Sequence, residues 1–311
     1  MIRHLKHAEI DAERWDRCIS QSVNGMIYAY SWYLDLVNNG WEALVENDYE
    51  RVMPLTHGRK LGIHYLFQPP FTQQLGIFSK NRLNHEVVDE FIEAIPPCFK
   101  FIEINLNTHN KVNPLYPGYS PWLTHELDLI SPYQNLRSNY STNTVRNIKK
   151  AVNAKISVVE NIKPEGIIDI FIKNKAEVLP GLKQDHFNLL RRLIYVMIYK
   201  RSAQTIGAFD ETNNLCAGAF FVFSKTKAIF YFSATDQKAK STGAMPFLID
   251  YFIHKHAHSH VTLDFEGSND PNLARFYKSF GASEITYPHL CINKLNPLVN
   301  FGAQLVKKLR F

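Results

Sequence analysis

The residues best suited to chemistry in this 311-residue sequence lie in a basic segment that directly precedes an apolar, helix-like run. They are Lys238, Lys240, Ser241, Thr242, Gly243 and Ala244. Free backbone N–H groups and the positive end of the helix dipole attract phosphate at a helix N-terminus, and a glycine allows the ligand to approach closely. The pattern predicts a phosphate-binding loop over residues 237–244. The alternative is that Ser241 or Thr242 is an ordinary helix N-cap.

Two carboxylates follow the helix-like run. The residues from Val261 to Ser268 alternate as in a strand, which places Asp264 and Glu266 on one face. A carboxylate at the end of a strand, near the N-terminus of the preceding helix, is suited to act as general base toward an amine. Glu266 is the preferred candidate. The alternative is that both acids balance nearby lysines or cap the next helix.

Tyr277 is a candidate general acid. It lies in the helix expected over residues 272–280, and a phenol can donate a proton to a leaving thiolate or hydroxyl. The alternative is that Tyr277 packs in the core beside Phe276 and Phe280.

Other common sites are excluded or disfavoured by the sequence. The histidines at positions 254, 256, 258 and 260 form two i, i+4 pairs on different faces of a helix, with no accompanying metalloprotease pattern, so no metal site is expected. No Walker loop, Gly-x-Gly-x-x-Gly or Gly-x-Ser-x-Gly motif occurs. The four cysteines are widely spaced and are expected to be buried free thiols.

The elements that must position these residues are predicted from periodicity. The second half reads as strands over 155–159, 203–209, 215–224 and 228–234, helices over 164–177, 186–201 and 245–260, and the strand and helix around the candidate acids. The first half reads as two helices within 8–40, strands over 41–46, 50–56, 62–68 and 100–106, and a helix over 84–95, with a turn at His57-Gly58. Strand, loop, helix and strand thus recur in both halves, which suggests two related halves.

Charge and hydropathy bound the class of protein. The net charge of +6 permits an anionic partner such as a CoA-type ligand, RNA or a membrane surface. A predicted helix contains Arg146, Lys149 and Lys150 within one turn, which is either a solvated face or a phosphate-binding one. No long apolar run or signal-peptide pattern occurs, so we expect a cytoplasmic protein without a membrane span.

The succession of strand 230–234, loop 237–244, helix, strand 262–266 and helix 274–281 resembles the acyl-CoA-binding half of the GNAT acyltransferase fold. Residues 143–151, followed by a strand, are similar to the start of the second domain in FemAB-like proteins, which carry two GNAT-type domains in tandem. The resemblance implies an α/β (α+β) fold of two tandem GNAT-like domains, each a mixed, mostly antiparallel sheet flanked by helices. Residues 1–121 would form a domain without its own cofactor site, and residues 122–311 the domain with the acyl-donor site.

The same resemblance implies an N-acyltransferase. It would transfer an acyl or aminoacyl group from a CoA thioester, acetyl-CoA or similar, to a small-molecule or peptide amine, with aminoacyl-tRNA as the alternative donor. Residues 237–244 would bind the pyrophosphate, the backbone of Phe232, Ser233 and Ala234 would hold the oxyanion, and Tyr277 matches the family's common tyrosine.

One departure from the GNAT pattern keeps a second function open. Of the usual Gln/Arg-x-x-Gly-x-Gly/Ala motif, only Gly243-Ala244 matches the end, and Ser241 stands where the earlier glycine is expected. The alternative function is therefore a catalytically inactive tandem-GNAT module that binds a peptide, glycan or RNA ligand.

Overall fold

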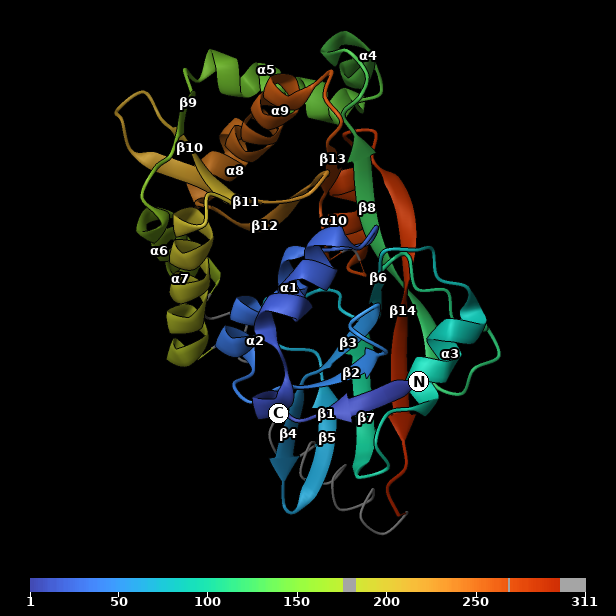
Figure 1. Cartoon of the computed structure of the whole chain (residues 1–311). Helices are drawn as coiled ribbons and strands as arrows, with labels where there is room; N and C mark the ends of the chain where they lie inside the picture. The colour runs from blue at the N-terminus through green and yellow to red at the C-terminus, as the bar shows by residue number, and fades with distance from the viewer. Residues whose placement is uncertain (176–182, 268, 297–311) are drawn as a thin grey trace. The chain divides into compact units, whose positions relative to one another are not determined.

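Figure 1 shows the computed structural model of the chain, which describes residues 1–175, 183–267 and 269–296. The contacts group the chain into two compact units. Unit 1 comprises residues 1–122 together with the segment from Tyr287, and unit 2 comprises Leu123–Thr286. The chain enters unit 2 within strand β8 (Tyr119–Asp128) and leaves it within β14 (Ser283–Asn293). The predicted domains, 1–121 and 122–311, stay a prediction.

Unit 1 contains two groups of strands. β1, β2, β3 and β6 form one antiparallel sheet in that order, while β4, β5, β7 and the end of β14 form the other group. Besides parts of β8 and β14, the elements of the unit are, in chain order, β1 (Ile2–Leu5), η1 (His7–Glu9), α1 (Ala12–Gln21), η2 (Ile27–Ala29), α2 (Ser31–Val37), β2 (Glu42–Glu46), β3 (Arg51–Leu55), β4 (His57–Lys60), β5 (Ile63–Phe67), β6 (Phe78–Ser79), α3 (His85–Glu93) and β7 (Phe99–Asn105).

Unit 2 contains one group of strands in the order β8, β13, β12, β11, β10, β9. Its elements, besides parts of β8 and β14, are α4 (Tyr133–Ser138), α5 (Thr142–Asn153), β9 (Ser157–Glu160), α6 (Pro164–Lys175), α7 (Gln184–Tyr199), β10 (Ala203–Phe209), β11 (Leu215–Ser224), β12 (Lys227–Thr235), α8 (Gln237–Thr242), α9 (Ala244–His256), β13 (Thr262–Asp264) and α10 (Pro271–Lys278). The strands and helices expected in this half are confirmed in order and type, apart from the segments corrected below.

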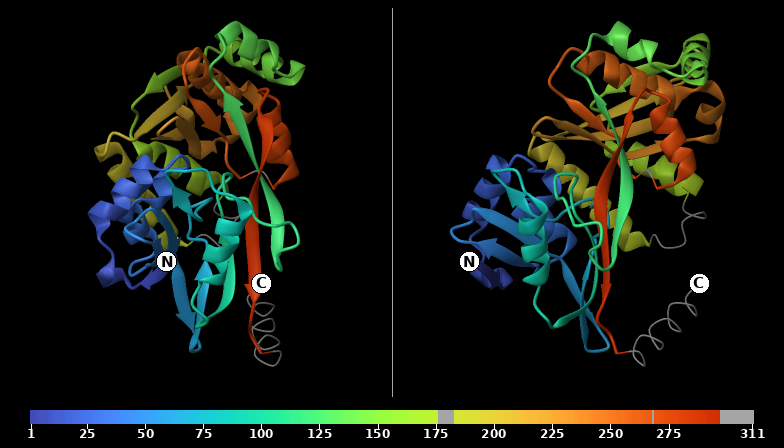
Figure 2. Two further views of the ribbon diagram at one scale, coloured as in Figure 1. Left: turned by 45° about the vertical axis from the view of Figure 1, so that its right-hand side comes forward. Right: turned by 90° about the vertical axis from the view of Figure 1, so that its right-hand side faces the viewer.

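The central strands of unit 2 are covered on both faces. Figures 1 and 2 show α8 and α9 on one face of β10, β11 and β12, and α6 and α7 on the other. Phe221 of β11 stacks on Phe252 of α9 with ring centroids 3.8 Å apart. On the opposite face α6 lies so close that a Cβ on Gly218 would stand 2.6 Å from Ile167 Cγ1. This double cover explains why β11 is almost continuously apolar rather than alternating.

Each unit contains one parallel strand pair joined by a helix. In unit 1 β5 and β7 are parallel and are connected through α3; in unit 2 β12 and β13 are parallel and are connected through α9. The remaining strand pairs within each unit are antiparallel. The sheets are therefore mixed and mostly antiparallel, as predicted, and the internal echo in the sequence corresponds to this repeated strand-helix-strand plan.

Several local predictions are corrected. His57 and Gly58, expected in a turn, belong to β4, which forms a hairpin with β5. α9 ends at His256 rather than His260. Cys18 and Cys216 are buried free thiols as expected, but Cys98 and Cys291 are exposed. Among the described residues, no helix combines the length and apolarity needed to cross a bilayer.

Candidate functional site

In unit 2, β12 and β13 are paired over only part of the length of β12. β12 and β13 are paired only over Lys227–Ile229 and Thr262–Asp264. β12 continues to Thr235 with β11 on its other side, whereas β13 has ended. Within the described chain, the edge of β12 beyond Ile229 therefore has no strand partner. Such an edge presents backbone N–H and C=O groups to a ligand.

A β-bulge decides which groups lie on this open edge. The register of β12 against β11 shifts at Tyr231, which is the extra residue. Beyond the bulge, Asp236 N–H donates to Cys216 O at 2.9 Å, so the hydrogen-bonded positions alternate back along β12 from Asp236. By this alternation the N–H groups of Ser233 and Thr235 point away from β11, toward the open edge. They are the backbone donors available there.

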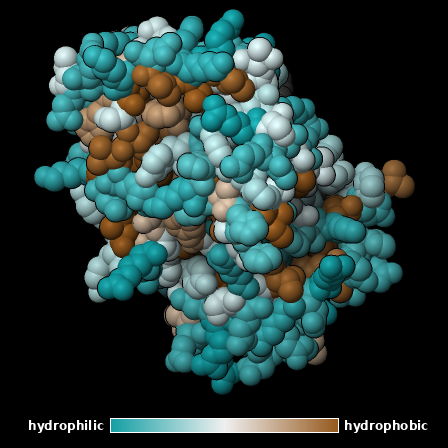
Figure 3. All heavy atoms as spheres, turned by 90° about the horizontal axis from the view of Figure 1, so that it is seen from above, coloured by the Kyte–Doolittle hydropathy of each residue, from teal (hydrophilic) through white to brown (hydrophobic). Residues whose placement is uncertain are grey.

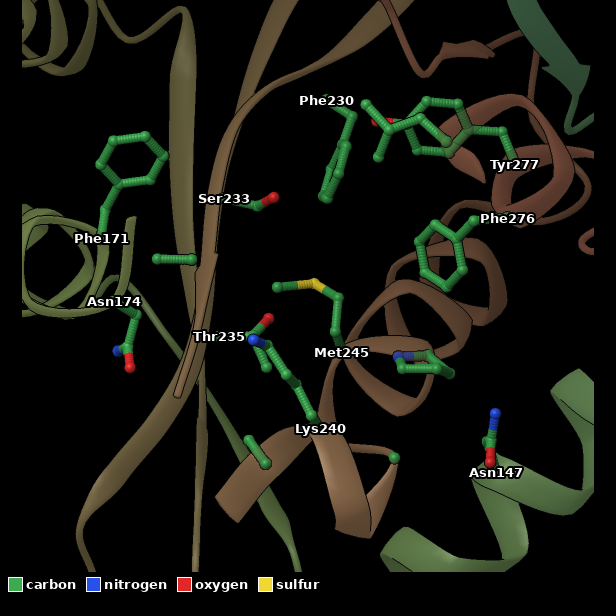
Figure 4. Close-up of a pocket in the computed structure, with 15 residues that line it drawn as sticks. Asn147, Phe171, Asn174, Phe230, Ser233, Thr235, Lys240, Met245, Phe276 and Tyr277 are labelled. Carbon is green, nitrogen blue, oxygen red and sulfur yellow. The ribbon is translucent and has the colours of Figure 1, made fainter. Parts of the chain in front are cut away.

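A pocket of about 330 Å³ follows the open edge, and we call it the β12-edge pocket. It is lined by Asn147, Phe171, Asn174, Phe230, Ser233, Ala234, Thr235, Ala239, Lys240, Gly243, Met245, Pro246, Leu273, Phe276 and Tyr277. Figure 4 shows the α6 side chains Phe171 and Asn174 on one side of β12, and the side chains from α8, α9 and α10 on the other. A volume of this size accommodates part of a small organic ligand.

Aromatic side chains form much of the wall. Phe276 and Tyr277 of α10 lie beside Phe230 of β12 in Figure 4, and the rings of Phe230 and Tyr277 approach edge to face at 6.4 Å. Tyr277 also stacks on Phe265 at 4.8 Å. Burial raises the pKa of Tyr277 well above its usual range, and the negative charge of Glu266 acts in the same direction. Tyr277 is therefore protonated at neutral pH and can donate a proton into the pocket.

Lys240 is the one charged side chain among the described residues that line the β12-edge pocket. Figure 4 shows its amine pointing toward Thr235. Lys238, the other lysine of the predicted loop, points elsewhere: its Nζ lies 2.9 Å from Asp210 Oδ2. This pairing raises the pKa of Lys238 and, together with hydrogen bonds from Thr212 and Asn214, lowers that of Asp210. Only one of the two predicted lysines is thus available to a ligand.

The predicted phosphate loop is largely helical. Residues Gln237–Thr242 form α8, whose N-cap Asp236 accepts from Ala239 N–H at 2.6 Å. Gly243 then adopts a left-handed conformation (φ 77°) and leads directly into α9. A Cβ at Gly243 would stand 2.3 Å from the backbone oxygen of Asn147 in α5. The glycine is thus required by the turn and by close helix packing, which is a sufficient reason for its presence.

The junction of α8 and α9 fits a CoA diphosphate poorly. An anion at a helix N-terminus needs several free N–H groups. In α9 the third position is Pro246, which has no N–H, and Ala244 at the first position is fully buried. Met245 is left as the pocket-lining N–H donor of the first turn. With a single lysine nearby, the junction offers little positive charge and few N–H donors to balance the negative charge of a diphosphate.

The predicted carboxylates do not line the β12-edge pocket. β13 ends at Asp264, and Glu266 has φ 55°, so the strand expected beyond Asp264 and the shared face of the two acids are wrong; Ser268 lies outside the described residues. Asp264 accepts from Thr124 Oγ1 at 2.7 Å and lies 3.3 Å from Lys227 Nζ. Lys227 also pairs with Glu126. Although burial favours the neutral amine, these two carboxylates hold the pKa of Lys227 above its usual value. Asp264 is therefore part of a buried ion network.

The structure brings together only part of the predicted site. Ser233, Ala234, Lys240, Gly243 and Tyr277 line the pocket. The predicted residues outside the lining are Phe232, Lys238, Ser241, Thr242, Ala244, Asp264 and Glu266. Phe232 packs on Phe171 of α6 with ring centroids 5.0 Å apart, while the hydroxyls of Ser241 and Thr242 donate to carbonyl groups within α8.

Sequence reasoning missed the residues that other elements contribute. Asn147 comes from α5, Phe171 and Asn174 from α6, and Leu273 and Phe276 from α10. Asn147 lies in the helix that contains Arg146, Lys149 and Lys150, so the basic residues of that helix were the signal that could have pointed to it. The α6 residues carried none, because a helical Phe and Asn look like ordinary core and surface positions. Among the described residues no cluster of His, Cys, Asp or Glu is arranged to hold a metal.

Comparisons with solved structures identify the fold. FemX aligns with a TM-score of 0.61 over 92% of this chain and 96% of its own, at 11% identity. L-PGS from Bacillus licheniformis aligns with a TM-score of 0.52 over 96% of both chains, at 11% identity. A tandem GNAT protein from the clavulanic acid biosynthesis pathway aligns with a TM-score of 0.51 over 95% of this chain and 99% of its own, also at 11% identity.

This chain has a FemAB-like tandem GNAT fold. No protein-family model and no curated protein matches it. At identities near 11%, these structural alignments establish the tandem GNAT fold and do not establish an activity. Within this fold, the β12-edge pocket belongs to unit 2, and every residue that lines it lies between Leu123 and Thr286.

Proposed function

We propose that this protein is an N-acyltransferase that holds an acyl thioester or ester in the β12-edge pocket and transfers the acyl group to an amine. The observation that supports this proposal most strongly is the separation of β12 from β13. It leaves the N–H groups of Ser233 and Thr235 without a strand partner at a partly apolar pocket. Preorganised backbone donors at a developing oxyanion contribute strongly to acyl transfer.

The residues of the pocket suit two parts of this chemistry. The acyl carbonyl accepts from the Ser233 or Thr235 N–H, which polarises the carbonyl carbon toward attack by a neutral amine. As the new C–N bond forms and the C–S or C–O bond breaks, Tyr277 gives its phenolic proton to the leaving atom. The phenolate then takes the proton released from the nitrogen. Burial raises the pKa of Tyr277, so the phenol holds its proton at neutral pH until the leaving atom develops negative charge.

Turnover with a panel of donors tests the proposal. Purified protein is incubated with acetyl and hexanoyl thioesters of CoA and of pantetheine, and with charged tRNA, in the presence of mixed primary amines and short peptides, and amide products are identified by mass spectrometry. We expect an amide from at least one donor and a loss of about 100-fold in turnover for Tyr277→Phe, the size of a typical general-acid effect. Tyr199→Phe, at an 87% exposed position, is the matched control and should leave turnover unchanged. No product from any donor, or full activity of Tyr277→Phe, would refute the proposal.

One observation favours a second candidate, a catalytically inactive binding module. No histidine or carboxylate is among the described residues that line the β12-edge pocket, so none of them is a conventional general base. Such a module would bind an acyl, peptide, glycan or RNA ligand without turnover. The panel above separates the candidates, because a binding module would be stabilised thermally by a ligand that it does not convert.

A further inference from the structure

We infer that the acyl donor of unit 2 is a 4′-phosphopantetheine thioester with a single phosphate, presented by an acidic carrier protein that docks on α5. This inference rests on the proposed function and names its donor. Three features support it: the charge of the pocket, the open edge of β12, and the surface beside the pocket mouth.

The charge of the β12-edge pocket matches one phosphate better than several. Among the described residues that line it, Lys240 is the only charged one, and Asn147 adds an amide from α5. Lys238 is engaged by Asp210, and the first turn of α9 is depleted of N–H donors by Pro246. Within the described lining, the diphosphate of a CoA thioester would meet a single ammonium. A phosphodiester carries one negative charge, which a single ammonium balances.

The open edge of β12 suits an arm that contains amides. A pantetheine arm offers N–H and C=O groups in an extended chain, as a peptide does when it adds to a sheet edge. Ser233 and Thr235 present the backbone positions for such pairing. An aminoacyl ester would instead bring an α-ammonium into a pocket whose described lining contains Lys240 and no carboxylate. The pocket therefore favours a neutral acyl group.

The surface that α5 contributes beside the pocket is basic. α5 packs against α8 and α9, and its Asn147 lines the pocket one turn before Lys150. Arg146, Lys149 and Lys150 are exposed on α5. Residues 129–159 contain no acidic side chain. Figure 3 views the molecule from the side on which α5 lies at the top of Figure 1, and most of this face is hydrophilic.

This basic surface fits an acidic protein better than an RNA strand. Complementary charge steers a carrier protein to the pocket and orients its arm. Single-stranded RNA is usually held by aromatic side chains on which bases stack. The sequence of α5, from Thr142 to Asn153, contains no aromatic residue.

The first experiment compares three hexanoyl thioesters by calorimetry without an amine present: hexanoyl-pantetheine, hexanoyl-4′-phosphopantetheine and hexanoyl-CoA. We expect the single phosphate to improve affinity about tenfold over pantetheine, the size of one charge-assisted contact, and CoA to bind no tighter than phosphopantetheine. Lys240→Ala should remove this gain in affinity. Lys238→Ala should retain it, because the amine of Lys238 points to Asp210. CoA binding tenfold tighter than phosphopantetheine, or no binding of the three, overturns the inference while leaving other donors open to the turnover assay.

The second experiment measures binding of a purified, hexanoyl-loaded acyl carrier protein. We expect micromolar binding that weakens as salt is raised and a loss of at least tenfold for Lys149→Glu/Lys150→Glu. Arg59→Glu/Lys60→Glu, a double charge reversal at exposed positions of β4, is the matched control and should bind as the unmodified protein does. Absence of carrier binding, equal loss in the control, or displacement of the carrier by uncharged tRNA at lower concentration overturns the docking of a carrier on α5.

Discussion

The parallel pairs β5–β7 and β12–β13 are built on the same plan and end in opposite ways. In unit 1 the space beyond β5 is filled by the chain itself: Asn105 N–H donates to Gln68 Oε1 at 3.0 Å, and Leu75 N–H donates to Asn105 O at 2.9 Å. Leu75 also bridges to Leu106 in parallel fashion. In unit 2 it is the second strand of the pair, β13, that ends early, and the edge of β12 that it leaves borders the β12-edge pocket.

This difference shows how one strand-helix-strand plan yields a closed structure and an open site. The segment after β5 contains two prolines, and the glutamine and asparagine side chains around it satisfy the backbone groups that a missing strand would leave unpaired. The segment after β12 instead turns at once into α8, and no described strand pairs with β12 at Ser233 and Thr235.

Removal of Lys227 should cause the largest loss of stability, because this residue forms ion pairs at the end where β12 and β13 are paired. Lys227→Ala leaves Glu126 and Asp264 without their cation in a buried site. We expect a loss of roughly 3–5 kcal/mol in the free energy of unfolding, measured by urea denaturation. Lys255→Ala, which removes a more exposed pair with Glu160, should change it by about 1 kcal/mol or less. Equal effects would contradict the assigned role of the network.

A side chain at Gly243 should separate α5 from the junction of α8 and α9. Gly243→Ala combines a left-handed conformation with a clash against the Asn147 backbone, and we expect a loss of roughly 2–4 kcal/mol in unfolding free energy. The matched control is Gly62→Ala, where φ is 81° and nothing lies within 4 Å of the added Cβ. This control should lose only about 1 kcal/mol. If the two variants lose the same stability, close helix packing does not explain Gly243.

Opening the filled edge of unit 1 should have a smaller effect. Gln68→Ala removes the acceptor of Asn105 N–H and the donor to Thr72 O, and we expect a loss of about 1–2 kcal/mol from the unsatisfied backbone group. Gln68→Glu keeps an acceptor for Asn105 and should recover part of this loss. Urea denaturation measures both variants. A Gln68→Ala variant as stable as the unmodified protein would show that the side chain does not close this edge.

The smallest effect concerns the two buried histidines, which differ in their hydrogen bonds. His125 of unit 2 is fully buried with no hydrogen-bond partner on either ring nitrogen within the described structure, whereas His289 of unit 1 bonds Asn105 at 2.9 Å. Burial lowers the pKa of His125, and the nearby Lys278 adds to this, opposed by Glu284 and Asp264.

Because the folded pKa of His125 is depressed, its neutral form contributes stability that is present above the unfolded pKa of about 6.5 and is lost as the pH falls below it. We expect His125→Phe to lie within about 1 kcal/mol of the unmodified protein at pH 7.5 and to lose less stability between pH 7.5 and 5. His289→Phe should be destabilised already at pH 7.5. Identical pH profiles for His125→Phe and the unmodified protein would contradict this account.

The sequence predicted the fold better than the site. Apolar periodicity was sufficient for β10, β11, β12 and α9, because these elements lie in a continuous core where the pattern decides the structure. It failed at residues 237–242, where polar residues that look like a loop form a helix capped by Asp236. It also failed at Glu266, because a left-handed residue ends the alternation in a way that composition does not reveal. Phe171 and Asn174 could not be predicted, since only tertiary packing brings α6 to the edge of β12.

Hydrogen exchange at the open edge tests the central claim most directly. Backbone exchange rates of Ser233 and Thr235 are measured by NMR with and without hexanoyl-4′-phosphopantetheine at saturating concentration. If the donor pairs with the edge of β12, both amides should exchange at least tenfold more slowly in the complex, while Gln68 and Leu75 of unit 1 keep their rates. A saturated complex in which the amides of Ser233 and Thr235 exchange as fast as in the free protein would contradict the account.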